Sequence, residues 1–318
     1  MWLNNLIEGI EKYKVIRSSG EMKVTVIGTT FVDIKGYPIG QFVPTGRNAG
    51  RVQQFYGGVA RNIAEDIINC DVDVDFVSLV DEGGIGADVV DHLRKKGVNV
   101  DYVRASKDGM GTWMAIFDPT GDVYASISRR PLLMPICNIL EECGDDIFPD
   151  TDAILLEIDV DEEIVEKTFE FAEKYNKPVY SVISNITIAV ERMPFILKSD
   201  CYVCNRQEAV AFWNVQEDDF STPEKALNTL KEKLTGSTLN KMVVTLDADG
   251  AVYAYNNGDG GIIESRKVNV VDTTGAGDSF FAGVSIGLAG GEQLGEACEK
   301  GNDMAAKVIQ TVGNVYVK

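Results

Sequence analysis

Histidine is almost absent from this chain, which has a single one, His92, among 318 residues. Ser-His-Asp and Cys-His hydrolases use histidine as their base, so the sequence weakens both of those hypotheses. The six cysteines are scattered, and Cys201-x-x-Cys204 is the only close pair. Without a second such pair a structural zinc site is disfavoured, and scattered thiols are typical of reduced cytoplasmic enzymes. His92 lies in a charged helical segment, 91–96, where we predict a solvated surface residue.

Positive charge and long apolar runs are also scarce. Lys and Arg total 30 against 49 Asp and Glu, and the formal net charge of −19 would repel the phosphates of nucleic acid. No apolar run reaches the roughly 20 residues that span a bilayer, and the N-terminus lacks the core of a signal peptide. We therefore expect no nucleic-acid partner, no membrane association and a cytoplasmic location. Hydrophobic residues make up 45% of the chain, enough for one large α/β domain or two ordinary ones.

The most informative stretch is D-T-T-G-A-G-D-S-F-F-A-G at 272–283, which lies between an extended run, 267–271, and an apolar segment, 280–288. The order strand, glycine turn, buried helix directs the free N–H groups of a helix's first turn at an anion. Gly275 and Gly277 carry no side chain that would keep a phosphate away. Asp278 adds a carboxylate that could take the proton of a hydroxyl attacking a phosphoryl group. The alternative is a helix-capping acid after a tight turn.

Strands and helices alternate along the rest of the chain. We predict strands at 23–28, 72–80, 152–158, 177–182, 200–203 and 241–246, and helices at 87–96, 161–175 and 292–310. Without a flexible linker, this order predicts one α/β domain on a doubly wound, mostly parallel sheet. The segments 112–117 and 123–127 alternate in polarity around a turn, so we assign them, with parts of 34–56, to a small separate sheet. Residues 1–21 show one apolar helical face and are predicted as an appended helix that docks on the body or on a partner subunit.

Polar residues follow several of these strands, at the edge where open α/β sheets bind ligands. Asp33 comes shortly after the first strand. The pair Gly57-Gly58 opens a helix that carries Asn62 about one turn inside. Asn205 and Glu208 share one face of a helix start, at the spacing of a capping box. Taken alone, each of these is also an ordinary turn or cap residue.

The 272–283 stretch closely resembles the signature of the ribokinase-like (PfkB-type) carbohydrate kinases, whose core reads D-T-x-G-A-G-D. The resemblance runs from 23 to 314, with the three other motifs in the family's order, and implies one kinase domain over 22–318. It implies a small β-sheet lid over the sugar site, formed here by about 34–56 and 111–128. Because that lid often joins subunits in the family, a homodimer is implied. By resemblance, Gly275, Ala276 and Gly277 form the anion hole and Asp278 is the catalytic base.

The resemblance also implies roles for the remaining candidates. The sugar-binding residues are Asp33, Gly57, Gly58 and Asn62. Asn205 and Glu208 organise Mg²⁺ through water near the phosphates, and Asp272 helps to hold a possible K⁺. The candidates for the ATP side are Thr245, Gly250, Thr274, Asn302 and Asn314, although plain core packing explains the last two equally well. Relatives often have glycine where this chain has Asp247, so the phosphate contacts there differ.

The sequence thus predicts transfer of the γ-phosphoryl group of ATP to a hydroxyl of a small sugar or nucleoside. The segments D-I-K-G-Y at 33–37 and G-G-V-A-R-N-I-A at 57–64 most resemble the pseudouridine kinase branch, which favours a pseudouridine-like acceptor. The segment 181–185 lacks the aspartate–proline pair of that branch, and Asn185 would supply a polar contact instead. Ribose, fructose-type sugars and other nucleosides stay open. Two other functions also stay open: a non-catalytic sugar- or nucleoside-binding sensor, and a phosphosugar kinase that uses the basic residues Lys35, Arg47, Arg51 and Arg61.

Overall fold

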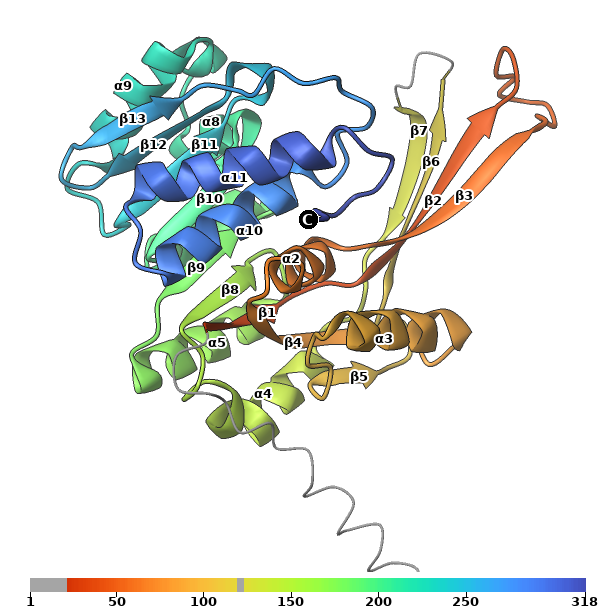
Figure 1. Ribbon diagram of the computed structural model, residues 1–318, viewed down its shortest axis with the longest axis horizontal. Helices are drawn as coiled ribbons and strands as arrows, with labels where there is room; N and C mark the ends of the chain where they lie inside the picture. The colour runs from red at the N-terminus through yellow and green to blue at the C-terminus, as the bar shows by residue number, and fades with distance from the viewer. Residues whose placement is uncertain (1–21, 119–122) are drawn as a thin grey trace, which may run out of the picture.

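A computed structural model describes residues 22–118 and 123–318 of the chain, so the helix predicted over 1–21 lies outside the described residues. Nine strands of the described part form one sheet, in the order β13-β12-β11-β10-β9-β8-β1-β4-β5 (Figure 1). Their bounds are β1 Lys23–Ile27, β4 Asp73–Val80, β5 Val103–Ala105, β8 Ala153–Glu157, β9 Val179–Val182, β10 Cys201–Asn205, β11 Lys241–Thr245, β12 Ala251–Tyr255 and β13 Gly260–Ile263. The strands from β5 to β11 pair in parallel, whereas β12 and β13 are antiparallel.

Helices cover both faces of this sheet, which confirms the predicted doubly wound architecture. Side chains along a strand point alternately into two hydrophobic clusters: Val24 and Val26 of β1 enter one, and Ile27 enters the other. The first cluster lies under α2 Val59–Ile68, α3 Gly84–Lys96, α10 Ala276–Ala289 and α11 Leu294–Val308, and the second under α4 Pro135–Ile147, α5 Glu162–Tyr175, α8 Arg206–Trp213 and α9 Pro223–Leu234. The shorter helices are α6 Ile186–Glu191, α7 Met193–Ile196, η2 Glu217–Phe220 and η3 Asp247–Asp249. Helices α10 and α11 lie side by side across the sheet (Figure 1).

Four further strands form a separate small sheet that stands away from the body (Figure 1). They are β2 Phe31–Pro38, β3 Gly50–Gly57, β6 Gly111–Phe117 and β7 Val123–Arg129, in the order β3-β2-β6-β7. The two hairpins β2–β3 and β6–β7 are antiparallel, and β2 joins β6 in parallel. The prediction of a small sheet beside the core is therefore confirmed.

The strand predicted at 267–271 is wrong, because residues 264–270 form no regular element. Val270 and Val271 are exposed. The N–H of Val271 donates to the carbonyl oxygen of Ile309 at 2.7 Å, so this backbone binds the end of α11 and not a neighbouring strand. A β-branched run favours an extended chain, but without a strand partner it does not become part of a sheet.

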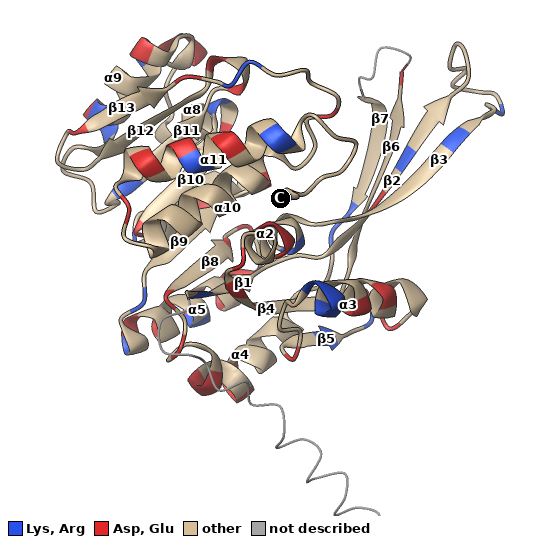
Figure 2. Cartoon of the chain, in the orientation of Figure 1, with Lys and Arg blue, Asp and Glu red and all other residues tan. Residues whose placement is uncertain are grey.

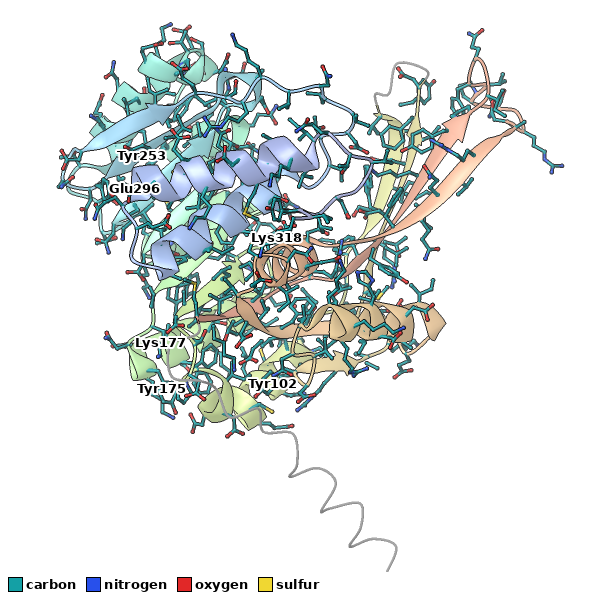
Figure 3. All side chains as sticks on the ribbon, viewed as in Figure 1. Tyr102, Tyr175, Lys177, Tyr253, Glu296 and Lys318 are labelled. Carbon is teal, nitrogen blue, oxygen red and sulfur yellow. The ribbon has the colours of Figure 1, made fainter. Side chains whose placement is uncertain are left out.

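Helix α11 begins over β12. The hydroxyl of Tyr255 accepts the N–H of Leu294 at 2.9 Å, and Glu296 accepts the N–H of Gln293 at 3.2 Å, closing a capping box. Figure 3 shows Tyr253 and Glu296 close together at this junction. Within residues 22–118 and 123–318, no helix has the length and apolar character needed to cross a membrane.

Candidate active site

The glycine turn at 275–277 has the backbone that an anion-binding loop requires. Gly275 caps α10 at a φ of 81°, in the left-handed region, and a Cβ there would lie 2.0 Å from the carbonyl oxygen of Asn314. Only glycine fits this position. At Gly277, in contrast, a Cβ would meet nothing within 4 Å. The space in front of the first turn of α10 is therefore open.

The N–H groups of this turn are only partly used inside the fold. Ala276 donates its N–H to the carbonyl oxygen of Thr273 at 3.2 Å. Gly277 and Asp278 belong to the first turn of α10, where the helix itself supplies no acceptor. The positive end of the helix dipole lies at the same place. Two N–H groups and the helix dipole can together stabilise an anion here.

Asp278 is half-buried beside these N–H groups. The side-chain amide of Asn62 donates to its Oδ2 at 2.6 Å. Burial, with a smaller contribution from the neighbouring Asp33, raises the pKa of Asp278 to about 6, while the Asn62 hydrogen bond and the Arg61 charge oppose the shift. Above that pH the carboxylate is ionised and can accept a proton, and its pKa is closer to neutrality than that of a free aspartate.

The orientation of Asn62 is fixed by its own partners. Its Oδ1 accepts hydrogen bonds from the Arg61 guanidinium and from Nδ2 of Asn314, the latter at 3.2 Å. Only its NH₂ group is then left to face Asp278. Asn314 also donates to the carbonyl oxygen of Tyr56 at 2.7 Å. The predicted sugar-binding asparagine is thus committed, in this structure, to the predicted base.

Asp33 faces the same site from β2. Burial raises its pKa to about 6, with Arg61 and then Lys35 opposing the shift. A Cβ at Gly57 would lie 2.4 Å from Oδ2 of Asp33, so this glycine leaves room for the carboxylate. Gly58 has a φ of 98°, and a Cβ at this position would lie 2.6 Å from the carbonyl oxygen of Thr29. Both positions therefore need glycine because neighbouring protein atoms occupy the space of a side chain. The sequence pattern alone indicates a different reason, the close approach of a ligand.

A cavity of about 1220 Å³ opens on the other side of the glycine turn. The candidates that line it are Asn205, Thr245, Gly250, Ala276, Gly277 and Asn302. Its apolar wall includes Phe280 and the small side chains of Ala305 and Ala306. An apolar slot with a few polar groups at its rim is typical of a site for a flat ring.

Two of the candidates for the ATP side, Thr274 and Asn314, and the substrate candidate Asn185 do not line this cavity. Thr274 binds Asp272 instead, and Asn314 binds Asn62 on the opposite side of the turn. Asn185 caps the short helix α6, where its Oδ1 accepts the N–H of Thr187 at 3.1 Å. Its role as a substrate contact stays a prediction.

The turn after β11, residues 247–250, begins with aspartate where relatives often have glycine. Asp247 lines the cavity and has a φ of 53°, the left-handed conformation that a glycine would favour. Asp249 forms an ion pair with Arg206 at 2.8 Å, which offsets the second acid. Asp247 thus adopts the backbone conformation that glycine would favour and adds one negative charge to the lining of the cavity.

Asn205 and Glu208 form the capping box in full. Oδ1 of Asn205 accepts the N–H of Glu208 at 2.9 Å, and Oε2 of Glu208 accepts the N–H of Asn205 at 2.8 Å. Burial raises the pKa of Glu208 to about 7, with Asp159 adding to the shift. Among the described residues, no three His, Cys, Asp or Glu side chains gather to hold a metal directly. One carboxylate and one amide beside the cavity fit Mg²⁺ that keeps most of its water.

Asp272 already has a cation beside it. Its Oδ2 lies 3.1 Å from Nζ of Lys35, and its Oδ1 accepts the N–H and the hydroxyl of Thr274 at 2.9 and 2.7 Å. The sequence did not indicate that Lys35 contacts the segment before the glycine turn. The available signal is its position two residues after Asp33, which places both side chains on one face of a strand.

Arg61 is the other important residue that the sequence did not single out in this role. It is 2% exposed, and its Nη1 lies 2.7 Å from Oε2 of Glu65. His92 lies 3.0 Å from the same carboxylate oxygen and packs on Tyr56 with ring centroids 5.5 Å apart. The prediction that His92 is a solvated surface residue is correct only in part, because its side chain is 35% exposed but Glu65 holds it against the body.

Comparison with known proteins agrees with this geometry. The family model described as pfkB family carbohydrate kinase matches residues 21–316. Guanosine-inosine kinase of Exiguobacterium acetylicum is 33% identical over 302 residues, 93% of this chain and 97% of that protein. Pseudouridine kinase of Escherichia coli (strain K12) is 23% identical over 264 residues, 82% of each chain.

Solved structures show the same fold. Ribokinase from Giardia lamblia has a TM-score of 0.78 at 15% identity, covering 92% of this chain and 96% of that one. Adenosine kinase from Sinorhizobium meliloti has a TM-score of 0.75 at 19% identity, covering 94% and 97%. The predicted ribokinase-like fold is confirmed. Because the family match extends over nearly the whole chain and a relative of similar length is one-third identical, the chain belongs to the pfkB family of carbohydrate kinases.

Proposed function

We propose that this kinase transfers the γ-phosphoryl group of ATP to a hydroxyl of a nucleoside. The observation that carries the proposal is the placement of Asp278 beside the free N–H groups of the glycine turn, between the cavity and Asp33. A base, an anion site and a second carboxylate for hydroxyl groups meet there. Phosphoryl transfer needs little more than this positioning and charge stabilisation.

Each group has a defined part in the reaction. The acceptor hydroxyl lies between Asp33 and Asp278, and Asp278 takes its proton as the oxygen attacks phosphorus. The N–H groups of Gly277 and Asp278 stabilise negative charge on the phosphoryl oxygens in the transition state. Asn62 keeps the Asp278 carboxylate in place, and its hydrogen bond favours the ionised form.

ATP would occupy the cavity behind the glycine turn, with the adenine against Ala305 and Ala306 and the phosphates toward Gly277. Glu208 and Asn205 would hold Mg²⁺ there through water. When bound, that ion offsets charge on the phosphates. A potassium ion at Asp272 would have to share the carboxylate with the Lys35 ammonium, which argues against that ion.

The acceptor class rests on the relatives and on two segments of the sequence. A guanosine-inosine kinase is 33% identical to this chain and covers 93% of it. The segments at 33–37 and 57–64 resemble the pseudouridine kinase branch, and a pseudouridine kinase is a more distant relative. We therefore propose nucleosides as acceptors, with guanosine and inosine ahead of pseudouridine.

A panel of acceptors in a coupled ADP-release assay tests this proposal. We expect the highest kcat/KM for guanosine, inosine or pseudouridine, with adenosine, uridine, ribose and fructose below them. A free sugar that outperforms every nucleoside would contradict the nucleoside assignment. No turnover on any acceptor, together with ligand-dependent thermal shifts, would instead support the non-catalytic sensor.

The structure weakens the phosphosugar alternative. Figure 2 shows Lys and Arg on β2 and β3 of the small sheet. However, Lys35 is paired with Asp272, and Arg61 is buried with Glu65. Arg51 stacks on Tyr37 with its guanidinium 4.8 Å from the ring centroid. These side chains do not form a free basic cluster for a second phosphate.

We also propose that the small sheet is a lid over the acceptor and joins two copies of the chain. Side chains alternate across a sheet, so the face opposite Asp33 and Lys35 is set by the strand register. That outer face carries Val52, Met114 and Ile127, which are 72%, 44% and 68% exposed. Exposed apolar side chains gathered on one face are typical of a protein interface.

Replacing Ile127 by aspartate should therefore convert a dimer into a monomer, since a charge would be buried in an apolar interface. Sedimentation or light scattering of the purified chain measures this. Ile262→Asp, a similar change at an exposed position on β13, is the matched control and should leave the oligomeric state alone. A wild-type chain that stays monomeric at micromolar concentration would contradict the proposal.

A further inference from the structure

The region around Asp272 does not fit the potassium ion that the family resemblance implies. Both carboxylate oxygens of Asp272 have partners, Thr274 on one side and the Lys35 ammonium on the other. Lys35 Nζ also donates to Oγ1 of Thr274 at 3.0 Å. A potassium ion at Asp272 would have to bind next to the buried Lys35 ammonium, and the two positive charges would repel each other.

Lys35 is built into this position. Its side chain is 2% exposed, and Nζ lies 5.2 Å from the ring centroid of Phe55 and 5.8 Å from that of Phe117. The two rings come from β3 and β6, while Lys35 itself comes from β2. A cation over aromatic faces with an opposed carboxylate is well compensated for its burial. The ammonium is therefore held by three strands of the small sheet.

We propose that the Lys35 ammonium takes the place of a monovalent cation at the glycine turn, so that the kinase needs no such ion. Thr274 directly precedes Gly275, the N-cap of α10, and Asp272 lies two residues before Thr274. By fixing these two side chains, Lys35 positions the loop whose N–H groups face the phosphoryl group. Lys35 is thus a positioning residue, and its part in catalysis rests on the proposed function.

The arrangement also connects the small sheet to the loop. Lys35 lies two residues from Asp33 on the same face of β2, and Asp33 faces the acceptor. A shift of β2 that moves Asp33 would therefore move the ammonium away from Asp272. Closure of the sheet over an acceptor and ordering of the glycine turn become one event.

The experiment measures both melting temperature and kcat of the wild type in potassium, sodium and tetramethylammonium chloride at equal ionic strength. We expect no difference among the three salts. Lys35→Met keeps the length and apolar stem of the side chain but removes the charge. Its kcat should fall about 10²-fold in tetramethylammonium, the loss that a small misplacement of reacting groups causes. Potassium or ammonium ions should restore part of the kcat and raise the melting temperature of this variant only.

Lys35→Arg is the matched charge-retaining variant and should stay indifferent to the salt even if Lys35→Met does not fold. A potassium-specific rise in the melting temperature or kcat of the wild type would overturn the proposal. A Lys35→Met enzyme that keeps the wild-type kcat would also overturn it. The same holds if Lys35→Met is inactive in every salt and its melting temperature does not change with potassium. If the wild type turned over no acceptor, the proposed function would fail, but the melting temperatures would still decide the cation question.

Discussion

Replacing Asp278 by asparagine is expected to lower kcat by about 10²- to 10⁴-fold, the usual contribution of a positioned base. Asparagine has almost the same shape and can still accept the hydrogen bond from Asn62, so the fold should be kept. Steady-state kinetics with ATP and the best acceptor measure the effect. A variant that is folded and turns over at nearly the wild-type rate would remove Asp278 from the reaction.

The pH dependence gives an independent control on the same residue. Because burial raises the pKa of Asp278 to about 6, the wild-type kcat/KM should fall as the pH drops through that value and the base becomes protonated. Asp33 has a similarly raised pKa, and its negative charge contributes to the raised pKa of Asp278. The acid limb should be absent from the residual activity of Asp278→Asn if that limb belongs to Asp278.

Stability should change in the opposite sense. An acid whose pKa is raised on folding favours the folded state at low pH and loses that contribution as the pH rises through its folded value. At pH 8, where the buried carboxylate is ionised, Asp278→Asn should therefore melt at the same temperature as the wild type or higher. A loss of activity without a loss of stability separates a catalytic role from a structural one.

Replacing Gly277 by alanine is expected to abolish most of the activity while leaving the fold slightly more stable. The new methyl group meets no protein atom within 4 Å, and Gly→Ala at a compatible position stabilises a protein by about 0.4–1 kcal/mol. The same methyl group would stand in front of the N–H groups that face the phosphoryl group. We expect kcat/KM for ATP to fall by about 10²- to 10³-fold, comparable to the loss of one oxyanion donor.

Gly275→Ala is the contrasting variant. Its methyl group would collide with the carbonyl oxygen of Asn314, and the left-handed φ disfavours any side chain, so both stability and activity should fall. Melting curves and ATP kinetics of the two variants give the comparison. Wild-type kinetics for Gly277→Ala would show that no anion binds at this turn.

Local sequence was sufficient for the parts of the site that are made of backbone. The turn at 275–277 depends on residues next to one another, and so does the capping box of Asn205 and Glu208. The nucleotide candidates Thr245, Gly250 and Asn302, which were implied by the family resemblance, also line one cavity. Strand ends in a parallel sheet meet at one edge, which is why separate segments could be assigned to one region.

The parts that could not be predicted depend on side chains distant in sequence. The contact of Lys35 with Asp272 and the bonds of Asn314 to Asn62 and Tyr56 join opposite ends of the chain. No local pattern shows which partner neutralises a lysine on a strand. The predicted strand at 267–271 was wrong for a related reason. Strand pairing requires two segments, and the sequence of one segment does not show whether a partner lies beside it.

The small sheet cannot be separated from the body as a module. Each of its hairpins, β2–β3 and β6–β7, has only two strands, and a lone hairpin is marginally stable in water. They complete one another through the β2–β6 pair, where Phe31 lies opposite Gly111. The chain between those residues runs through β4 and α3 of the core, so the small sheet is assembled only when the core has brought the hairpins together. A single hairpin moved to another protein would therefore lack its partner hairpin, whereas changes at the hairpin tips would leave the β2–β6 pairing intact.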